Sequence, residues 1–141
     1  YGVLAILLIT LIKWNAIITL ATGKPYEIAI LSIICAHSLS RFSIIVIPYF
    51  SIPASDEGLA RYAGEPETRG VIGGFLLTSF LIFLLLPFDQ AILSAVLAIL
   101  VAGVVGLLAN FQIKGYTGDI LGAAQQVSEA TVLVYLASSS S

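Results

Sequence analysis

Charged residues are scarce in this sequence. Six Lys and Arg and eight Asp and Glu make up 10% of its 141 residues, whereas a soluble domain carries about 25%. No basic stripe or tail is present, so we expect no nucleic acid as a partner. Because 59% of the residues are hydrophobic, we expect an integral membrane protein that is embedded in the lipid bilayer.

Cysteine and methionine are also nearly missing. The single cysteine, Cys35, lies in an apolar run with no second thiol, which excludes a disulfide framework. Methionine is absent and the chain begins at Tyr1, so we expect a C-terminal fragment of a longer protein. Residues 1–137 are expected to belong to one membrane domain, and the serine run at 138–141 to form a disordered tail.

Long apolar segments dominate what is present. Roughly 20 apolar residues cross the hydrocarbon layer, and none of the segments alternates with the period of two that barrel strands show. The third segment is short, unless it begins near Thr68. The sequence therefore predicts an all-α, polytopic transmembrane helix bundle of about five spans, at residues 1–20, 28–50, 71–86, 90–111 and 119–137.

The basic residues of the connections indicate an orientation. Five spans place the 51–70 and 112–118 connections on one side, with Arg61, Arg69 and Lys114, whereas the other side has only Lys24. Basic residues accumulate on the cytoplasmic side of a membrane. We therefore expect a multi-pass protein whose 51–70 connection faces the cytoplasm.

Several ionisable residues interrupt the apolar segments, namely Lys13, His37, Arg41, Asp119 and Glu129. Such a group costs about 3 kcal/mol at the centre of a membrane helix, and it usually faces the bundle interior, has a partner and serves a function. We expect these residues to converge on one polar pocket that opens toward the cytoplasm.

The last span has the strongest local pattern. On a helix, Asp119, Gly122, Gln126 and Glu129 fall within an arc of about 80°. Asp119 stands where a carboxylate can cap backbone N–H groups, which is the structural alternative to a catalytic role. Glu129 lies about 15 Å further along the helix, so it requires an internal cation or a proton.

His37 and Arg41 are spaced i, i+4 and share a helix face. A guanidinium group binds phosphate through two parallel hydrogen bonds, so an anion site is one interpretation of this pair. The structural alternative is that Arg41 pairs with Asp119 or Glu129. Lys13 is expected to form a third wall of the same polar interior.

The long connection contains Asp56, Glu57, Gly58 and Arg61 within two helical turns. This combination can bind a phosphate or a metal-bound diphosphate, although an exposed surface turn has the same composition. Mg²⁺ prefers a few carboxylates together with substrate phosphates. With cations nearby, the sequence is compatible with Mg²⁺-dependent phosphoryl transfer, in which positioning and charge neutralisation dominate catalysis.

The stretch from Gly115 to Ala123 (GYTGDILGA), followed by Glu129, resembles the C-terminal signature of the cobalamin synthase (adenosylcobinamide-GDP ribazoletransferase) family. The Ser40-Arg41 pair, the Glu57-Gly58-Leu59 stretch with Arg61, and the glycine-led first span with Lys13 resemble other parts of that family in the same order. In the loop, the arginine comes three residues after the glycine, which departs from the simplest family pattern.

This resemblance implies a multi-pass enzyme of the cell inner membrane that requires Mg²⁺. It implies the joining of adenosylcobinamide-GDP to α-ribazole or its phosphate, with release of GMP. The main acidic motif of the family, an Asp-Gly-Leu-Ala-Asp-like stretch, precedes the part seen here, so this chain alone is expected to be inactive.

Candidate roles follow from this hypothesis. Asp119 and Glu129 are the candidate catalytic residues, with Asp119 also a candidate metal ligand. The candidate substrate- or phosphate-binding residues are Lys13, His37, Arg41, Glu57, Gly58 and Arg61.

Three other functions remain open from the sequence. A CDP-alcohol-type phosphotransferase would use similar metal–diphosphate chemistry with a lipid alcohol. A small transporter or channel would also place charges within its spans. A non-enzymatic membrane scaffold would leave the balanced interior charges unexplained. The sequence does not determine the oligomeric state, and a homo-oligomer is one alternative.

Overall fold

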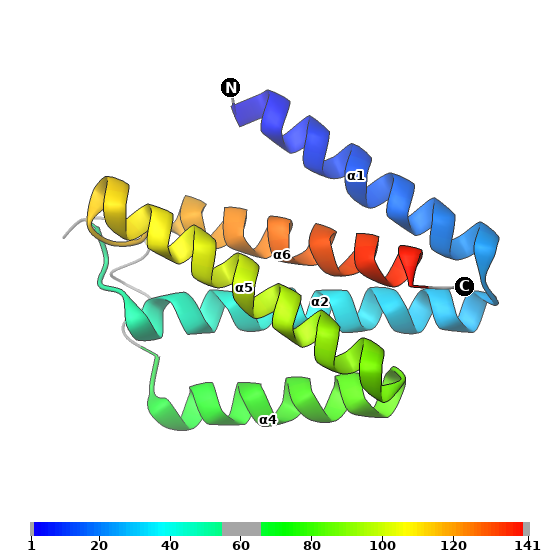
Figure 1. Cartoon of the computed structure of the whole chain (residues 1–141). Coiled ribbons are helices and arrows are strands. Elements are labelled where there is room, and N and C mark those ends of the chain that lie inside the picture. Colours follow the sequence, from blue (N-terminus) through cyan, green and yellow to red (C-terminus); the bar gives the residue numbers. More distant parts are fainter. Residues whose placement is uncertain (1, 55–65, 140–141) are drawn as a thin grey trace.

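The computed structural model describes residues 2–54 and 66–139, and these residues form five helices (Figure 1). Each helix is long and apolar enough to cross a membrane. The predicted all-α transmembrane bundle is therefore confirmed. The helices are α1 (Gly2–Gly23), α2 (Tyr26–Phe50), α4 (Thr68–Leu85), α5 (Phe88–Ile113) and α6 (Gly118–Ser138).

The helix ends differ from the expected spans by only a few residues. The third span begins at Thr68, which gives α4 its 18 residues. Proline follows the ends of α1 and α4, because its ring cannot continue a helix. At the C-terminus, α6 includes Ser138, which the sequence had assigned to the tail.

Two antiparallel helices, α2 and α6, lie side by side at the centre of the bundle (Figure 1). α5 crosses both of them, α4 packs against α2, and α1 packs against α6. α1 diverges from α6 toward its own N-terminus, and its only buried side chains are Ala16 and Leu20. The first half of α1 is thus exposed on all sides.

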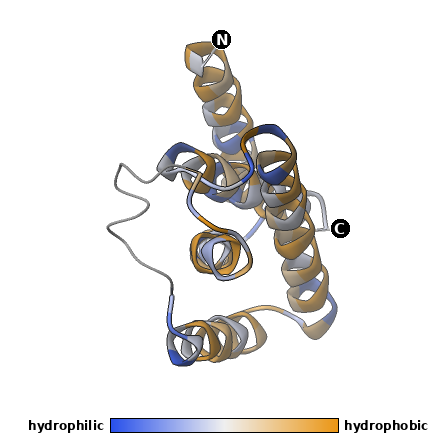
Figure 2. Cartoon of the chain, turned by 90° about the vertical axis from the view of Figure 1, so that its left-hand side faces the viewer, coloured by the Kyte–Doolittle hydropathy of each residue, from blue (hydrophilic) through white to orange (hydrophobic). Residues whose placement is uncertain are grey.

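The two ends of the bundle differ in their connections. One end has the short turns at Lys24-Pro25 and Leu86-Pro87, whereas the other has residues 51–54, 66–67 and 114–117. We call the latter the loop end. Figure 2 views the bundle from the loop end, and the hydrophilic colours gather at helix ends while the helix bodies are mostly hydrophobic.

Lys24 lies at the opposite end, and its Nζ donates to the Leu136 carbonyl of α6 at 3.4 Å. A cation at a helix C-terminus interacts favourably with the helix dipole. Burial lowers the pKa of this Lys24 side chain. The contact attaches the α1–α2 turn to the end of α6.

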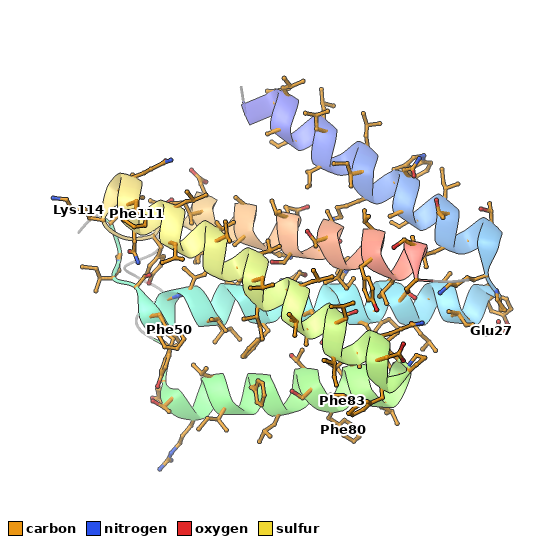
Figure 3. All side chains as sticks on the ribbon, viewed as in Figure 1. Glu27, Phe50, Phe80, Phe83, Phe111 and Lys114 are labelled. Carbon is orange, nitrogen blue, oxygen red and sulfur yellow. The ribbon has the colours of Figure 1, made fainter. Side chains whose placement is uncertain are left out.

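Small side chains fill many of the helix contacts, and many of the large apolar side chains face outward. Cys35 and Ala36 on α2 and Ala91 on α5 have no exposed surface, and small residues allow helix backbones to approach closely. Between α2 and α6, Ser43 Oγ donates to Ser128 Oγ at 3.3 Å. The outward-facing aromatic side chains labelled in Figure 3 are Phe50, Phe80, Phe83 and Phe111.

Candidate functional site

An ion cluster joins α1, α2 and α6 in their middle portions. The side chain of Glu129 on α6 is 2% exposed, and its Oε1 lies 2.6 Å from Lys13 Nζ on α1. The same oxygen lies 3.4 Å from His37 Nδ1 on α2. Lys13 Nζ also donates to Gln126 Oε1 at 3.0 Å. Glu129 therefore has the internal cation that its position in the sequence required.

The spacing of residues on α6 explains this arrangement. Gln126 and Glu129 are spaced i, i+3, so they lie on one face and both reach Lys13. The cluster is closed around Glu129 but open at His37, whose side chain is 53% exposed. The expected convergence of embedded ionisable groups is thus confirmed for Lys13, His37 and Glu129, and it is wrong for Asp119, which lies in the first turn of α6.

Arg41 lies one turn from His37, nearer the loop end, and it is exposed. Within residues 2–54 and 66–139, Arg41 forms no ion pair. The alternative that Arg41 pairs with Asp119 or Glu129 is therefore wrong for these residues. Arg41 does not pair with Glu129 because Lys13 and His37 already contact that carboxylate. Asp119 lies about 15 Å further along α6, at the loop end.

A groove of about 570 Å³ between α2 and α4 includes both His37 and Arg41 in its wall. Most of its other lining residues are apolar, and the polar ones are hydroxyls. The remaining lining residues are Ile33, Ile34, Ser38, Phe42, Ile45, Gly74, Leu77 and Thr78. The groove therefore presents one exposed guanidinium group beside a largely apolar surface.

Asp119 lies at the loop end, in the first turn of α6. It is not the helix cap, because Thr117 occupies that position and its Oγ1 accepts from Ile120 N at 3.4 Å. A negative charge in the first turn is still favourable for the helix dipole. The carboxylate is exposed and has no ion pair within the described part of the chain.

The described residues do not form a metal site by themselves. Nowhere among them do three His, Cys, Asp or Glu side chains come together in a way that could hold a metal ion. Mg²⁺ prefers several oxygen ligands from carboxylates and substrate phosphates. Asp119 can therefore supply only one ligand of the predicted set.

A backbone bridge fixes residues 52–54 against the segment that leads into α6. Ala54 N donates to Tyr116 O at 2.9 Å, and Tyr116 N donates to Ile52 O at 3.0 Å. A Cβ at Gly115 would lie 2.5 Å from Ile52 O, so only glycine permits this close approach. Lys114, just before it, has a left-handed conformation with φ 57°.

Sequence reasoning missed this bridge. Gly115 and Tyr116 belong to the GYTGDILGA stretch, but the bridge partner of Tyr116 is Pro53, 63 residues earlier in the chain. The adjacent Lys114-Gly115 pair, with a glycine just after a helix, was the only local signal of a tight turn.

Comparison with known proteins assigns the family. The family model described as cobalamin-5-phosphate synthase matches residues 1–137. The chain belongs to this family. No solved structure matches it.

Curated relatives of this cobalamin-5-phosphate synthase family are named adenosylcobinamide-GDP ribazoletransferase. The chain is 36% identical over 139 residues to the one from Shewanella pealeana and 35% identical over 134 residues to the one from Mesorhizobium japonicum. It is 32% identical over 137 residues to the one from Bradyrhizobium diazoefficiens. These alignments cover 95–97% of this chain but 50–53% of each relative, so the chain spans about half their length.

The candidate residues of this cobalamin-5-phosphate synthase family member fall into two regions. Lys13, His37 and Glu129 form the ion cluster, whereas Asp119 lies at the loop end. Arg41 lies on α2 one helical turn after His37, toward the end of the helix at Phe50. The other candidates, Glu57, Gly58 and Arg61, lie outside the described residues.

Proposed function

We propose that this chain forms part of an adenosylcobinamide-GDP ribazoletransferase. The reaction transfers the cobinamide-linked phosphoryl group to a hydroxyl of α-ribazole or its phosphate and releases GMP. The match of residues 1–137 to the cobalamin-5-phosphate synthase family is the observation that carries the proposal. The names of the relatives favour this activity over a CDP-alcohol-type transferase, a transporter or a scaffold.

In the proposed reaction, a ribazole hydroxyl attacks the cobinamide-linked phosphorus in line. The new P–O bond forms as the bond to GMP breaks, and the hydroxyl proton is released. The guanidinium group of Arg41 suits binding of a substrate phosphate, because it is exposed and has no ion pair in the described ranges. Lys13 and Arg61 are the other proposed cations.

We assign Glu129 a positioning role, since it contacts Lys13 and His37 rather than open space. We propose that Asp119 orients the hydroxyl or supplies one Mg²⁺ ligand, with the remaining ligands coming from outside the described residues. Bound Mg²⁺ would supply neutralisation of diphosphate charge. Because Asp119 is the only candidate ligand in the described part, the chain alone is proposed to be inactive.

We propose further that the protein lies in the cell inner membrane with the loop end in the cytoplasm. Arg69 and Lys114 lie at the loop end and Lys24 at the other, which supports this orientation under the positive-inside rule. The exposed Asp119 would then meet its soluble substrates from the cytoplasm. A homo-oligomer remains an untested prediction.

The test of this function is an Asp119→Asn substitution in the complete protein. We expect it to lower kcat for cobalamin formation at least about 100-fold, because a charge that contacts the reacting groups is lost. The matched control is Asp89→Asn, since Asp89 also lies in the first turn of its helix but at the opposite end of the bundle. Unchanged turnover by Asp119→Asn would refute the role of Asp119, and absence of product from the wild type would refute the function.

A further inference from the structure

The groove between α2 and α4 carries a charge, that of Arg41, which no described residue compensates. Arg41 is nine residues from the end of α2 at Phe50, which places its backbone about 13 Å inside the end of the helix. An ionised group at such a depth requires a partner. None of residues 2–54 and 66–139 forms an ion pair with it, so among these residues nothing competes with an anionic ligand for this guanidinium group.

The groove is also extended and asymmetric. Its α2 wall runs from Ile33 to Ile45, a length of about 18 Å. Arg41 lies toward the loop end of this wall, whereas Ile33 and Ile34 lie toward the opposite end of α2. A ligand that fits would therefore have an anionic portion nearer the loop end and an apolar portion extending toward the opposite end.

The α4 wall is open because of one glycine. A Cβ at Gly74 would contact Phe42 and Ile45 at 3.5 Å, which is ordinary packing distance, so any longer side chain would extend into the groove. Gly73, the adjacent residue, would have no neighbour within 4 Å of an added Cβ. The groove thus exists where Gly74 leaves space beside Phe42.

We propose that this groove is the binding site for the acceptor nucleoside, α-ribazole, in the proposed transferase reaction. The flat aromatic base lies among the apolar side chains and against Phe42, and a phosphate on the ribose pairs with Arg41. The groove volume of about 570 Å³ is in the range of small-molecule sites, about 300–1,000 Å³. This inference rests on the proposed function and adds to it the location of one of the two substrates.

A phospholipid fits the groove less well. Its phosphate lies at the membrane surface, whereas the Arg41 backbone lies about 13 Å inside the end of α2. Phe42 lines the groove, and aromatic side chains favour stacking with a flat base. Both features favour an aromatic nucleoside phosphate as the occupant.

The first experiment fills the groove in the complete protein with Gly74→Leu and uses Gly73→Leu as the matched control. We expect Gly74→Leu to raise KM for α-ribazole about tenfold or more, since its side chain occupies the space of the base. KM for adenosylcobinamide-GDP should change less than about twofold in both variants. Gly74→Ala, which adds only a Cβ at packing distance, is the fallback if Gly74→Leu does not fold, and it should raise KM for α-ribazole alone.

The second experiment tests the charge with Arg41→Gln. We expect KM for α-ribazole phosphate to rise about 10- to 100-fold, as for loss of a charged hydrogen bond, while KM for unphosphorylated α-ribazole changes little. Both measurements are made in nanodiscs with and without anionic phospholipid. An effect of Arg41→Gln that disappears without anionic lipid would identify a lipid as the occupant and overturn the proposal.

Two further results distinguish a failure of the groove as acceptor site from a failure of the proposed function. If the wild type forms product but Gly74→Leu leaves KM for α-ribazole unchanged, or raises both KM values equally, the groove is not the acceptor site. If the wild type forms no product from these substrates, the proposed function itself fails and the groove proposal fails with it.

Discussion

At the scale of single residues, Glu129 is the side chain on which the ion cluster depends. It is almost fully buried and contacts Lys13 at 2.6 Å and His37 at 3.4 Å. A buried ion pair often contributes little net stability relative to a well-packed apolar pair, because both charges lose their solvation. Removing one partner is much more costly, since the other charge remains buried.

Lys13→Met should therefore destabilise the protein more than the loss of both charges does. We expect a cost of about 3–5 kcal/mol for Lys13→Met and a smaller cost for the double variant with Glu129→Leu, because no unpaired carboxylate remains. Thermal unfolding in detergent measures both.

Thr10→Val is a suitable control on the same helix. The Thr10 hydroxyl is exposed and donates only to the Ile6 carbonyl of its own helix, so we expect a change within about 0.5 kcal/mol. A double variant as unstable as Lys13→Met would contradict the pairing of the two charges.

The sequence predicted that Glu129 is buried and needs a cation, but it did not predict which residue supplies that cation. Helical spacing places Gln126 and Glu129 on one face, and burial of Glu129 requires a cation. Spacing within one helix does not say which neighbouring helix lies against that face. The choice of Lys13 and His37 over Arg41 therefore came only from the three-dimensional structure.

At the scale of elements, the approach of residues 52–54 to residues 115–116 depends on Gly115. The two backbone hydrogen bonds of this bridge connect the segment after α2 to the start of α6. Residues 52–54 and the segment at 115–116, which leads into the first turn of α6 and Asp119, are thereby held together. Thr117 then begins α6, which fixes Asp119 in its first turn.

Gly115→Ala should disrupt this contact. The added Cβ would lie 2.5 Å from Ile52 O and 2.8 Å from Ala54 N, and backbone atoms cannot move aside without breaking the bridge. We expect a loss of about 1–3 kcal/mol of stability, as for other overpacked sites. Thermal unfolding in detergent measures it.

Gly103→Ala provides the comparison for this prediction. Gly103 lies in α5, and an added Cβ there would have nothing within 4 Å. Because alanine favours a helix over glycine, we expect this variant to be as stable as the wild type or more so. Equal effects of the two substitutions would contradict the close approach at Gly115.

At the scale of the whole molecule, the alternation of the five helices places every charged connection at one of two ends. Hydrophobic length alone predicted the spans, since about 20 apolar residues are needed for each crossing. How the helices pack could not be predicted, because apolar surface faces lipid and core alike in a membrane protein. The exposed first half of α1 and the groove beside Gly74 both belong to this unpredicted part.

The proposed orientation predicts a pattern of chemical labelling. In a Cys35→Ser background, single cysteines replace Glu67 and Lys114 at the loop end, and Glu27 and Asp89 at the other end. A membrane-impermeant maleimide added to intact cells should label Glu27→Cys and Asp89→Cys. The two loop-end cysteines should react only after permeabilisation, and the reverse pattern would show the opposite orientation.

The contact between Lys13 and Glu129 also constrains how the chain is made. The two residues are 116 positions apart in the sequence, so the ribosome synthesises the carboxylate roughly 6–23 s after the lysine at 5–20 residues per second. During that time Glu129 cannot serve as the counter-ion of the Lys13 ammonium group. The contact between α1 and α6 through these two side chains can therefore form only after α6 has been synthesised.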